Sequence, residues 1–320
     1  MSEIKAAIIG HILGDAMGLP FQFKSRSWFN LHPVNSMVGY LAFNKPSGSF
    51  SDDASLSLAL MDSLSHGYQR EDIMDKFVAW LMEGKYTQEG QAFDNGQTTS
   101  QSILNYYGGI SIDRCGGKSF YDNGNGSLMR ILPLLFYLRD QFGDDFIKNK
   151  TAIQIIHEVS ALTHGHPIAL MACGLYLSVA NQLLSPLPLL ETVQAGLDRA
   201  FVYYDSNHDY FTHRLVYHRL RNLSEFTQLP VQSIKSSGYV VDTLEASLWC
   251  LLSTNSYQAC IIKAVNLGDD TDTVAAIAGG LAGLYYGYLA FPLEWVRAIH
   301  HRELVDNLID QFEDSLRKSV

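Results

Sequence analysis

Apolar residues recur three to four positions apart along most of this 320-residue chain, and this period constrains the fold more than any other feature. After Asp52, for example, Ala54, Leu58 and Met61 fall on one face of a helix, and Gly67 is a plausible stop. Alternating, β-branched runs of strand length are nearly absent. The sequence therefore predicts an all-α fold, a bundle of many helices.

The same period divides the chain into helices and long connections. Besides the stretch after Asp52, helices are expected at about 2–17, 71–82, 97–107, 127–139, 151–162, 167–184, 190–203, 240–253, 257–265, 273–289 and 302–317. Loops rich in Gly, Asn, Ser and Pro are expected at 30–50, 108–126 and 204–235. No internal repeat or shift in composition divides the chain, so we expect one domain over residues 1–320.

Charge and cysteine usage exclude several classes of protein. The formal charge is −10, from 23 Lys and Arg against 33 Asp and Glu, so binding to a nucleic-acid backbone is not expected. Four scattered cysteines without CxxC spacing indicate reduced, packed thiols. The first residues lack the basic and then apolar order of a signal peptide. We therefore expect a cytoplasmic protein.

One segment has the length of a membrane span. Residues 274–293 carry no charge, and Gly279, Gly283 and Gly287 repeat at the spacing of small-residue helix contacts. The run opens on an acidic cluster and contains three tyrosines midway. A helix buried in the protein core is the favoured interpretation, and no contact with a membrane is expected.

Two acidic clusters each stand directly before a predicted helix. Ser51-Asp52-Asp53 precedes one helix, and Asp270-Thr271-Asp272-Thr273 precedes another. Residues one or two apart do not share a helix face, so both clusters fit a junction between loop and helix, where their oxygens can converge. Helix capping is the alternative, but one cap explains only one carboxylate in each cluster.

The composition of these clusters favours a hard cation. They offer carboxylate and hydroxyl oxygens without His or Cys, which suits Mg²⁺ or Mn²⁺ better than zinc. Asp52, Asp53, Asp270 and Asp272 supply four negative charges, enough to balance two divalent ions. We therefore expect a central binuclear site that orients a water molecule and binds sugar hydroxyls.

Two further elements are candidates for substrate contacts. The turn Gly124-Asn125-Gly126-Ser127 leads toward a predicted helix, where backbone N–H groups could approach a phosphate, although glycine-rich helix starts are also common without a ligand. Thr163-His164-Gly165-His166-Pro167 separates two predicted helices. A polar turn, with His164 contacting ribose or phosphate, is favoured over metal ligation by its histidines.

Taken in order, these elements resemble those of the ADP-ribosylglycohydrolase family, and the resemblance spans nearly the whole chain. Five segments carry it: Gly14-Asp15-Ala16-Met17-Gly18-Leu19-Pro20 is similar to the opening GDAxGxP, Ser51-Asp52-Asp53 to (T/S)DD, Gly124 to Arg130 to GNGxxMR, Thr163-His164 to the TH element, and Gly268 to Thr273 to G(G/D)DTDT.

The resemblance implies an orthogonal helical bundle with two Mg²⁺ or Mn²⁺ ions, which hydrolyses the bond between ADP-ribose and a protein side chain or small acceptor. Asp53 and Asp270 would take part in catalysis. The implied metal ligands are Ser51, Asp52, Asp53, Asp270, Asp272 and Thr273. The implied substrate-binding residues are Asn123, Gly124, Asn125, Gly126, Ser127 and His164.

One departure from the family pattern concerns catalysis. Two residues after GDAxGxP the family usually has a Glu, where this chain has Gln22. An amide keeps the shape of the side chain but cannot act as a base. Three functions stay open: an active hydrolase, a catalytically impaired ADP-ribose and metal binder, and an acidic Mg²⁺-dependent phosphohydrolase.

Overall fold

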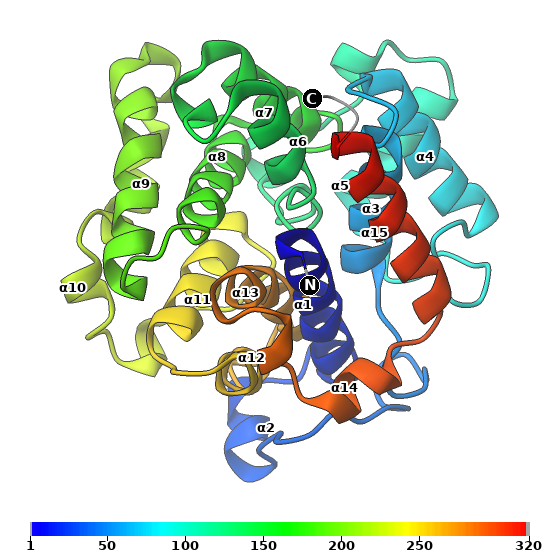
Figure 1. Ribbon diagram of the computed structural model, residues 1–320, viewed down its shortest axis with the longest axis vertical. Coiled ribbons are helices and arrows are strands. Elements are labelled where there is room, and N and C mark those ends of the chain that lie inside the picture. Colours follow the sequence, from blue (N-terminus) through cyan, green and yellow to red (C-terminus); the bar gives the residue numbers. More distant parts are fainter. Residues whose placement is uncertain (1, 318–320) are drawn as a thin grey trace.

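The computed structural model describes residues 2–317, and these residues form an all-α fold. Figure 1 shows helices that run in several directions around α1 (Glu3–Gly18) and α13 (Thr271–Tyr286). Within residues 2–317 there is no β-strand, only the isolated bridges Gly117–His164 and Gly124–Tyr239. The predicted fold class is therefore confirmed.

The other helices surround this central pair. They are α2 Arg26–Leu31, α3 Asp52–Leu64, α4 Arg70–Glu83, α5 Gln97–Tyr107, α6 Leu134–Phe142, α7 Lys150–Ala161, α8 Pro167–Gln182, α9 Leu189–Ser206, α10 Leu223–Phe226, α11 Val240–Leu252, α12 Tyr257–Val265, α14 Leu293–Ala298 and α15 Arg302–Arg317. Short 3₁₀ helices are η1 Leu19–Phe21, η2 Ile112–Arg114, η3 Phe120–Asp122, η4 Phe146–Lys148, η5 His208–Tyr210, η6 His213–Arg221, η7 Val231–Ser233 and η8 Tyr288–Ala290.

Most of these helices begin and end within three residues of the predicted stretches, but the prediction for 127–139 is wrong in its first half. That helix begins only at Leu134, after a series of turns. Pro133 explains the delay, because its ring removes a backbone donor and disfavours the helical conformation in the preceding residue. The predicted loop 204–235 also contains short helical turns, which are too brief to show a hydrophobic period.

Helices α1 and α13 approach so closely that only glycine fits at the crossing. A Cβ on Gly14 would lie 2.0 Å from the carbonyl oxygen of Ala275, and one on Gly283 would lie 2.3 Å from that of Ala6. The small residues in 274–293 therefore allow close contact between two helices of the same chain. Gly287 has a different function, since it ends α13 with a φ of 76°.

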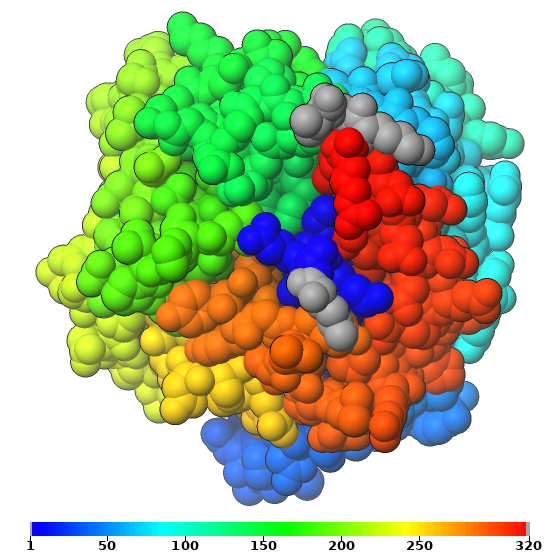
Figure 2. Space-filling model, viewed as in Figure 1, coloured from blue at the N-terminus to red at the C-terminus, as the bar shows by residue number. Residues whose placement is uncertain are grey.

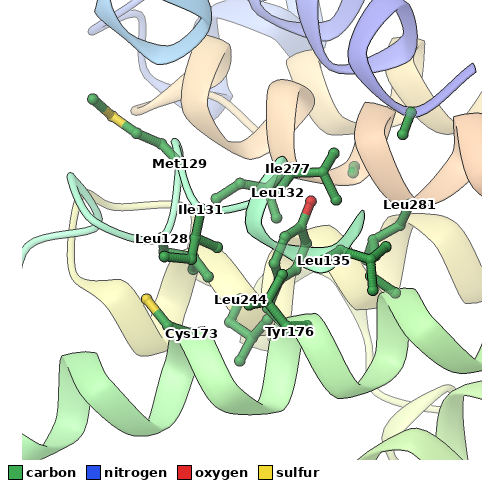
Figure 3. Close-up of a cluster of buried hydrophobic side chains, with 14 of the residues drawn as sticks. Leu128, Met129, Ile131, Leu132, Leu135, Cys173, Tyr176, Leu244, Ile277 and Leu281 are labelled. Atoms are coloured by element: carbon green, nitrogen blue, oxygen red, sulfur yellow. The ribbon is translucent and has the colours of Figure 1, made fainter. Parts of the chain in front are cut away.

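A hydrophobic cluster lies beneath the turn at 124–130. Figure 3 shows Leu128, Ile131 and Leu132 packed toward Tyr176 of α8 and Ile277 of α13, whereas Met129 points away from the cluster. Burial of such side chains is the main favourable contribution to folding. The turn is therefore anchored to α8 and α13, although it is not itself helical.

The apolar helices are buried within the protein. The helical segment Glu3–Phe21 is long and apolar enough to cross a membrane by length and composition, but 89% of its most apolar window is buried. In Figure 2 only a small dark-blue patch of it is visible, between the orange and red C-terminal segments. Residues Thr271–Leu284 of α13 are also buried, as expected for a core helix.

Candidate active site

The carboxylate of Asp15, near the end of α1, holds the first turn of α3. It accepts hydrogen bonds from the N–H of Ser51 at 2.9 Å and of Ala54 at 3.0 Å. Burial raises the pKa of Asp15 to about 7, although these hydrogen bonds oppose the rise. Asp15, the aspartate in GDAMGLP, thus positions the start of α3. This role was not predicted from the sequence.

His11, one turn earlier on α1, joins α1 to both α3 and α13. Its Nδ1 lies 3.1 Å from the Ala276 carbonyl oxygen, and its Nε2 lies 3.2 Å from the Ser57 hydroxyl. Burial lowers the pKa of His11 to about 4, so the ring is neutral at neutral pH. A neutral ring with its proton on Nδ1 donates to the carbonyl and accepts from the hydroxyl.

The early acidic cluster lies in the first turn of α3. Ser51 caps the helix, because its Oγ accepts from the N–H of Asp53 at 3.3 Å, and the same hydroxyl donates to Asp53 Oδ2 at 3.1 Å. Asp53 Oδ1 is buried without a hydrogen-bond partner. Burial, together with the neighbouring carboxylates, raises the pKa of Asp52 and Asp53 well above the usual range. One cap is therefore present, and both carboxylates are left for another function.

The late cluster begins α13 without using its carboxylates as a conventional cap. Asp270 occupies the cap position but makes no capping hydrogen bond. Its Oδ2 accepts from Asn125 Nδ2 at 2.7 Å instead, and its Oδ1 is buried without a partner. Asp272 Oδ2 also lacks a partner, and burial raises the pKa of Asp272 well above its usual range. Capping alone does not account for this cluster.

The fold brings the two clusters into direct contact. Thr273 Oγ1 donates to Asp53 Oδ2 at 3.3 Å, joining positions 220 residues apart in sequence. Within residues 2–317, however, no three Asp, Glu, His or Cys side chains are already arranged as ligands of one ion. The carboxylates are therefore neighbours whose free oxygens would have to turn toward a common point to bind a cation.

The turn at 124–130 is fixed by a buried arginine. Arg130 Nη1 donates to the Gly126 carbonyl at 2.6 Å, and Nη2 donates to Thr163 Oγ1 at 2.7 Å. Burial lowers the pKa of Arg130 to about 10, and its guanidinium lies 4.8 Å from the centre of the Phe77 ring. The predicted helix N-terminus is absent here, so any phosphate contact would involve the turn itself.

His164 stands behind this turn. Its Nδ1 lies 2.8 Å from Thr163 Oγ1, the hydroxyl that also accepts from Arg130. Burial, with a smaller contribution from Arg130, lowers the pKa of His164 to about 3. The ring is therefore neutral and can exchange hydrogen bonds with a ligand but adds no charge.

These elements surround a cleft of about 640 Å³. Its lining residues are Gln22, Phe23, Asp52, Asp94, Asn95, Gly96, Gln97, Thr98, Thr99, Gly124, Asn125, Gly126, Met129, His164, Ser237, Gly238, Asp269, Asp270 and Thr273. No Lys or Arg belongs to this lining. The charged residues of the lining are all acidic, so its side chains offer an anionic ligand no positive charge.

Some predicted residues lie outside the cleft lining. Asn123 lines an adjoining hollow with Phe120 and Tyr121. The hydroxyl of Ser127 faces the core, where it accepts from Ser160 Oγ at 2.8 Å. A ligand contact from the Ser127 side chain is therefore not supported. Ser51, Asp53 and Asp272 are buried beneath the cleft surface.

Gln22 and Asp94 lie together in the cleft. Gln22 Oε1 and Asp94 Oδ2 are buried without hydrogen-bond partners. Burial raises the pKa of Asp94 to about 6, and contacts with the side chains of Asp272 and Gln22 oppose the rise. Asp94 was missed by the sequence analysis, because it belongs to an irregular loop and has a left-handed φ of 58°. The separation in sequence between Asp94 and the other carboxylates matches no motif that would have identified it.

The fold and the order of its motifs point to one class of enzyme. The family model described as ADP-ribosylglycohydrolase matches residues 1–319, so this chain belongs to the ADP-ribosylglycohydrolase family. The solved structure of an ADP-ribosylglycohydrolase-related protein complex superimposes with a TM-score of 0.78 at 26% identity. The match covers 99% of this chain and 98% of that one.

Named relatives share most of their length with this chain. ADP-ribosylarginine hydrolase Tri1 of Serratia proteamaculans (strain 568) is 31% identical, over 97% of this chain and 79% of the relative. The ADP-ribosyl-[dinitrogen reductase] glycohydrolase of Rhodospirillum rubrum is 28% identical, over 91% of this chain and 87% of the relative. Human ADP-ribosylhydrolase ARH3 is 23% identical, over 100% of this chain and 95% of the relative. The family is thus one of glycoside-cleaving hydrolases.

Proposed function

We propose that this chain is a Mg²⁺-dependent hydrolase that cleaves the glycosidic bond between ADP-ribose and a protein side chain or small acceptor. The observation that carries the proposal is the contact of Thr273 with Asp53, which unites the two acidic clusters beneath one cleft. The names of the relatives, hydrolases of ADP-ribosyl linkages, support the reaction class. The order of the five motifs supports the same assignment.

The donor set fits hard cations. Asp53 Oδ1, Asp270 Oδ1 and Asp272 Oδ2 are buried oxygens without partners, and buried carboxylates of this kind are costly unless protonated or paired with a cation. A diphosphate would add negative charge to a lining without Lys or Arg. We assign two Mg²⁺ or Mn²⁺ ions to Ser51, Asp52, Asp53, Asp270, Asp272 and Thr273. When bound, such ions lower the pKa of water and polarise sugar hydroxyls.

The chain's own residues would then bind and orient the substrate. The N–H groups of the turn Gly124–Gly126 are suited to the diphosphate, and the neutral ring of His164 to a ribose hydroxyl. Water replaces the acceptor at C1″ of ribose: the C1″–acceptor bond breaks, a C1″–oxygen bond forms, and one proton passes to the acceptor. Asp94 is a cleft carboxylate that could accept a proton from the water.

A second candidate function follows from Gln22. Its amide lines the cleft where the family pattern has a carboxylate, and an amide cannot accept a proton from water. If that carboxylate is the base, turnover would be about 10²–10⁴-fold lower than with Glu. The chain would then be a catalytically impaired binder of ADP-ribose and metal.

Release of free ADP-ribose tests the proposal. Peptides carrying ADP-ribose on arginine or on serine are incubated with the protein and Mg²⁺, with chelator in a parallel reaction. We expect ADP-ribose to form only when the metal is present. No release from either linkage would refute hydrolysis, and release of inorganic phosphate from ADP-ribose would favour the phosphohydrolase instead.

The variant Gln22→Glu separates the two candidate functions. If the chain is impaired, this variant should raise kcat by about 10²–10⁴-fold. Gln101→Glu is the matched control, because Gln101 is an exposed residue of α5. Substantial activity in the native chain, unchanged by Gln22→Glu, would exclude impairment.

A further inference from the structure

A short backbone pairing builds one edge of the cleft, which we call the Phe23–Asp269 rim. The N–H of Phe23 donates to the carbonyl oxygen of Asp269 at 2.8 Å, and the N–H of Asp269 donates to that of Lys24 at 2.8 Å. These reciprocal hydrogen bonds fix residues 23 and 269 side by side. Both residues line the cleft.

Both residues of the rim have an unfavourable backbone conformation. The φ angle is 67° at Phe23 and 59° at Asp269, in the left-handed region, which is uncommon for Asp and strained for a bulky residue such as Phe. Such conformations persist only where the surroundings impose them, and they concentrate at ligand sites. The fold therefore holds both residues in place at the edge of the cleft.

The rim presents an aromatic ring beside an unpaired carboxylate. Phe23 is 75% exposed although it lines a cleft. The Asp269 carboxylate makes no hydrogen bond or ion pair with any other residue of 2–317. The nearby Arg26 attracts this carboxylate through space but forms no ion pair with it, because the Arg26 guanidinium donates to the carbonyl oxygens of Val231 and Ile234 at 2.6 Å.

This combination suits a planar cation. A guanidinium group stacks on aromatic faces and pairs with a carboxylate through two parallel hydrogen bonds. A diphosphate, in contrast, would be repelled by Asp269. The rim is therefore chemically unlike the turn Gly124–Gly126, where backbone N–H groups suit an anion.

The chain order places this rim beside the carboxylates. Phe23 directly follows Gln22, and Asp269 directly precedes Asp270. With ribose above the carboxylates and the diphosphate at the turn 124–126, the acceptor group would lie toward the rim. We propose that Phe23 and Asp269 recognise the guanidinium of an ADP-ribosylated arginine side chain and so select this acceptor. The inference rests on the proposed glycohydrolase function.

The selection is tested with two peptides that differ at one position. One carries ADP-ribose on an arginine and the other on a serine. Phe23→Leu removes the aromatic face, Phe23→Tyr retains it, and Asp269→Asn removes the charge. Phe23→Leu and Asp269→Asn should each lower kcat/KM for the arginine-linked peptide by about tenfold. Both should leave the serine-linked peptide within about twofold of the unmodified chain.

Matched controls are Phe211→Ala and Asp310→Asn, at exposed positions outside the cleft lining. Phe23→Tyr should behave as the unmodified chain. An equal loss on both peptides, or no loss on either, would overturn the assignment. Melting curves for each variant check that the fold is retained.

The affinity for each peptide tests the inference independently of turnover. With fluorescent peptides, the chain should bind the arginine-linked form about tenfold more tightly than the serine-linked form, and Asp269→Asn should abolish the difference. Equal affinities would refute the rim's selectivity. Absence of hydrolysis with this preference intact would refute only the proposed reaction.

Discussion

At the scale of single residues, the buried carboxylates reduce the stability of the folded protein when no cation is bound. Asp52 and Asp53 lie in one turn of α3, and burial raises the pKa of both well above the usual range. Groups of this kind reduce stability in their charged form, and a bound cation reverses the effect. Stability with and without divalent ions therefore reports on the candidate site directly.

Replacing one of these carboxylates should change stability in opposite directions with and without metal. Asp52→Asn is expected to stabilise the chelated protein by about 1–3 kcal/mol, because it removes a buried like charge. It should also reduce the increase in melting temperature that Mg²⁺ produces. Calorimetric melting in EDTA and in Mg²⁺ measures both, with Asp310→Asn as control. A less stable chelated variant with an unchanged Mg²⁺ effect would contradict the ligand assignment.

The same carboxylates predict how stability depends on pH. Asp15 has a pKa of about 7, raised from 3.8, and burial raises the pKa of Asp52 and Asp53 well above the usual range, so between pH 6.5 and about 7 the folded protein holds protons that the unfolded chain has already lost. Stability of the chelated protein should therefore fall as pH rises through this window. At lower pH, His11 and His164 act in the opposite sense, since burial lowers their pKa to about 4 and 3.

Urea unfolding in EDTA at several pH values measures how steeply the free energy of unfolding changes with pH. Saturating Mg²⁺ should flatten it, because the ion replaces the protons. A stability that rises between pH 6.5 and 7 in EDTA would show that the carboxylates are not protonated in the folded protein.

At the scale of elements, helical periodicity was sufficient to place most helices, because each buries an apolar face. It failed at 127–133, where Pro133 and the buried Arg130 replace a helix with turns. It also gave no information on Asp94, which reaches the cleft through an irregular loop. The two acidic clusters were found because loop-to-helix junctions can be recognised from sequence. The partners of Asp15 depend on how α1 meets α3, which no local pattern contains.

The crossing of α1 and α13 sets the geometry beneath the cleft. Gly14→Ala would place a Cβ 2.0 Å from the Ala275 carbonyl oxygen, so the two helices must separate. We expect a loss of about 1–3 kcal/mol in stability and weaker Mg²⁺ binding, because Asp15 and Asp272 would move apart. Denaturant unfolding and calorimetric titration test this.

Gly108→Ala is the matched control, since Gly108 has a φ of −76° and an exposed position after α5. It should leave metal affinity unchanged. Equal behaviour of the two variants would show that the close contact of α1 with α13 does not support the site.

At the scale of the whole molecule, the candidate site joins segments from both ends of the sequence. Residues 51–53 come from the first fifth of the chain, and residues 270–273 from the last. The contact between these segments is a single hydrogen bond of 3.3 Å from the Thr273 hydroxyl to Asp53, and the neighbouring carboxylates Asp270 and Asp272 repel Asp53. A cation bound between them would connect α3 to α13 much more firmly.

Hydrogen exchange should reveal this connection as a regional effect. If the ions bind as proposed, Mg²⁺ would stabilise only conformations in which α1, α3 and α13 are assembled, so slow amides in these three helices should gain protection together. Helices α9 and α10 contribute no residue to the cleft lining, and their amides that exchange by local opening should not change. Protection confined to residues 51–53, without α13, would mean that the ion binds one cluster alone. The proposed bridging by two ions would then be wrong, even if the chain still hydrolyses ADP-ribosyl linkages.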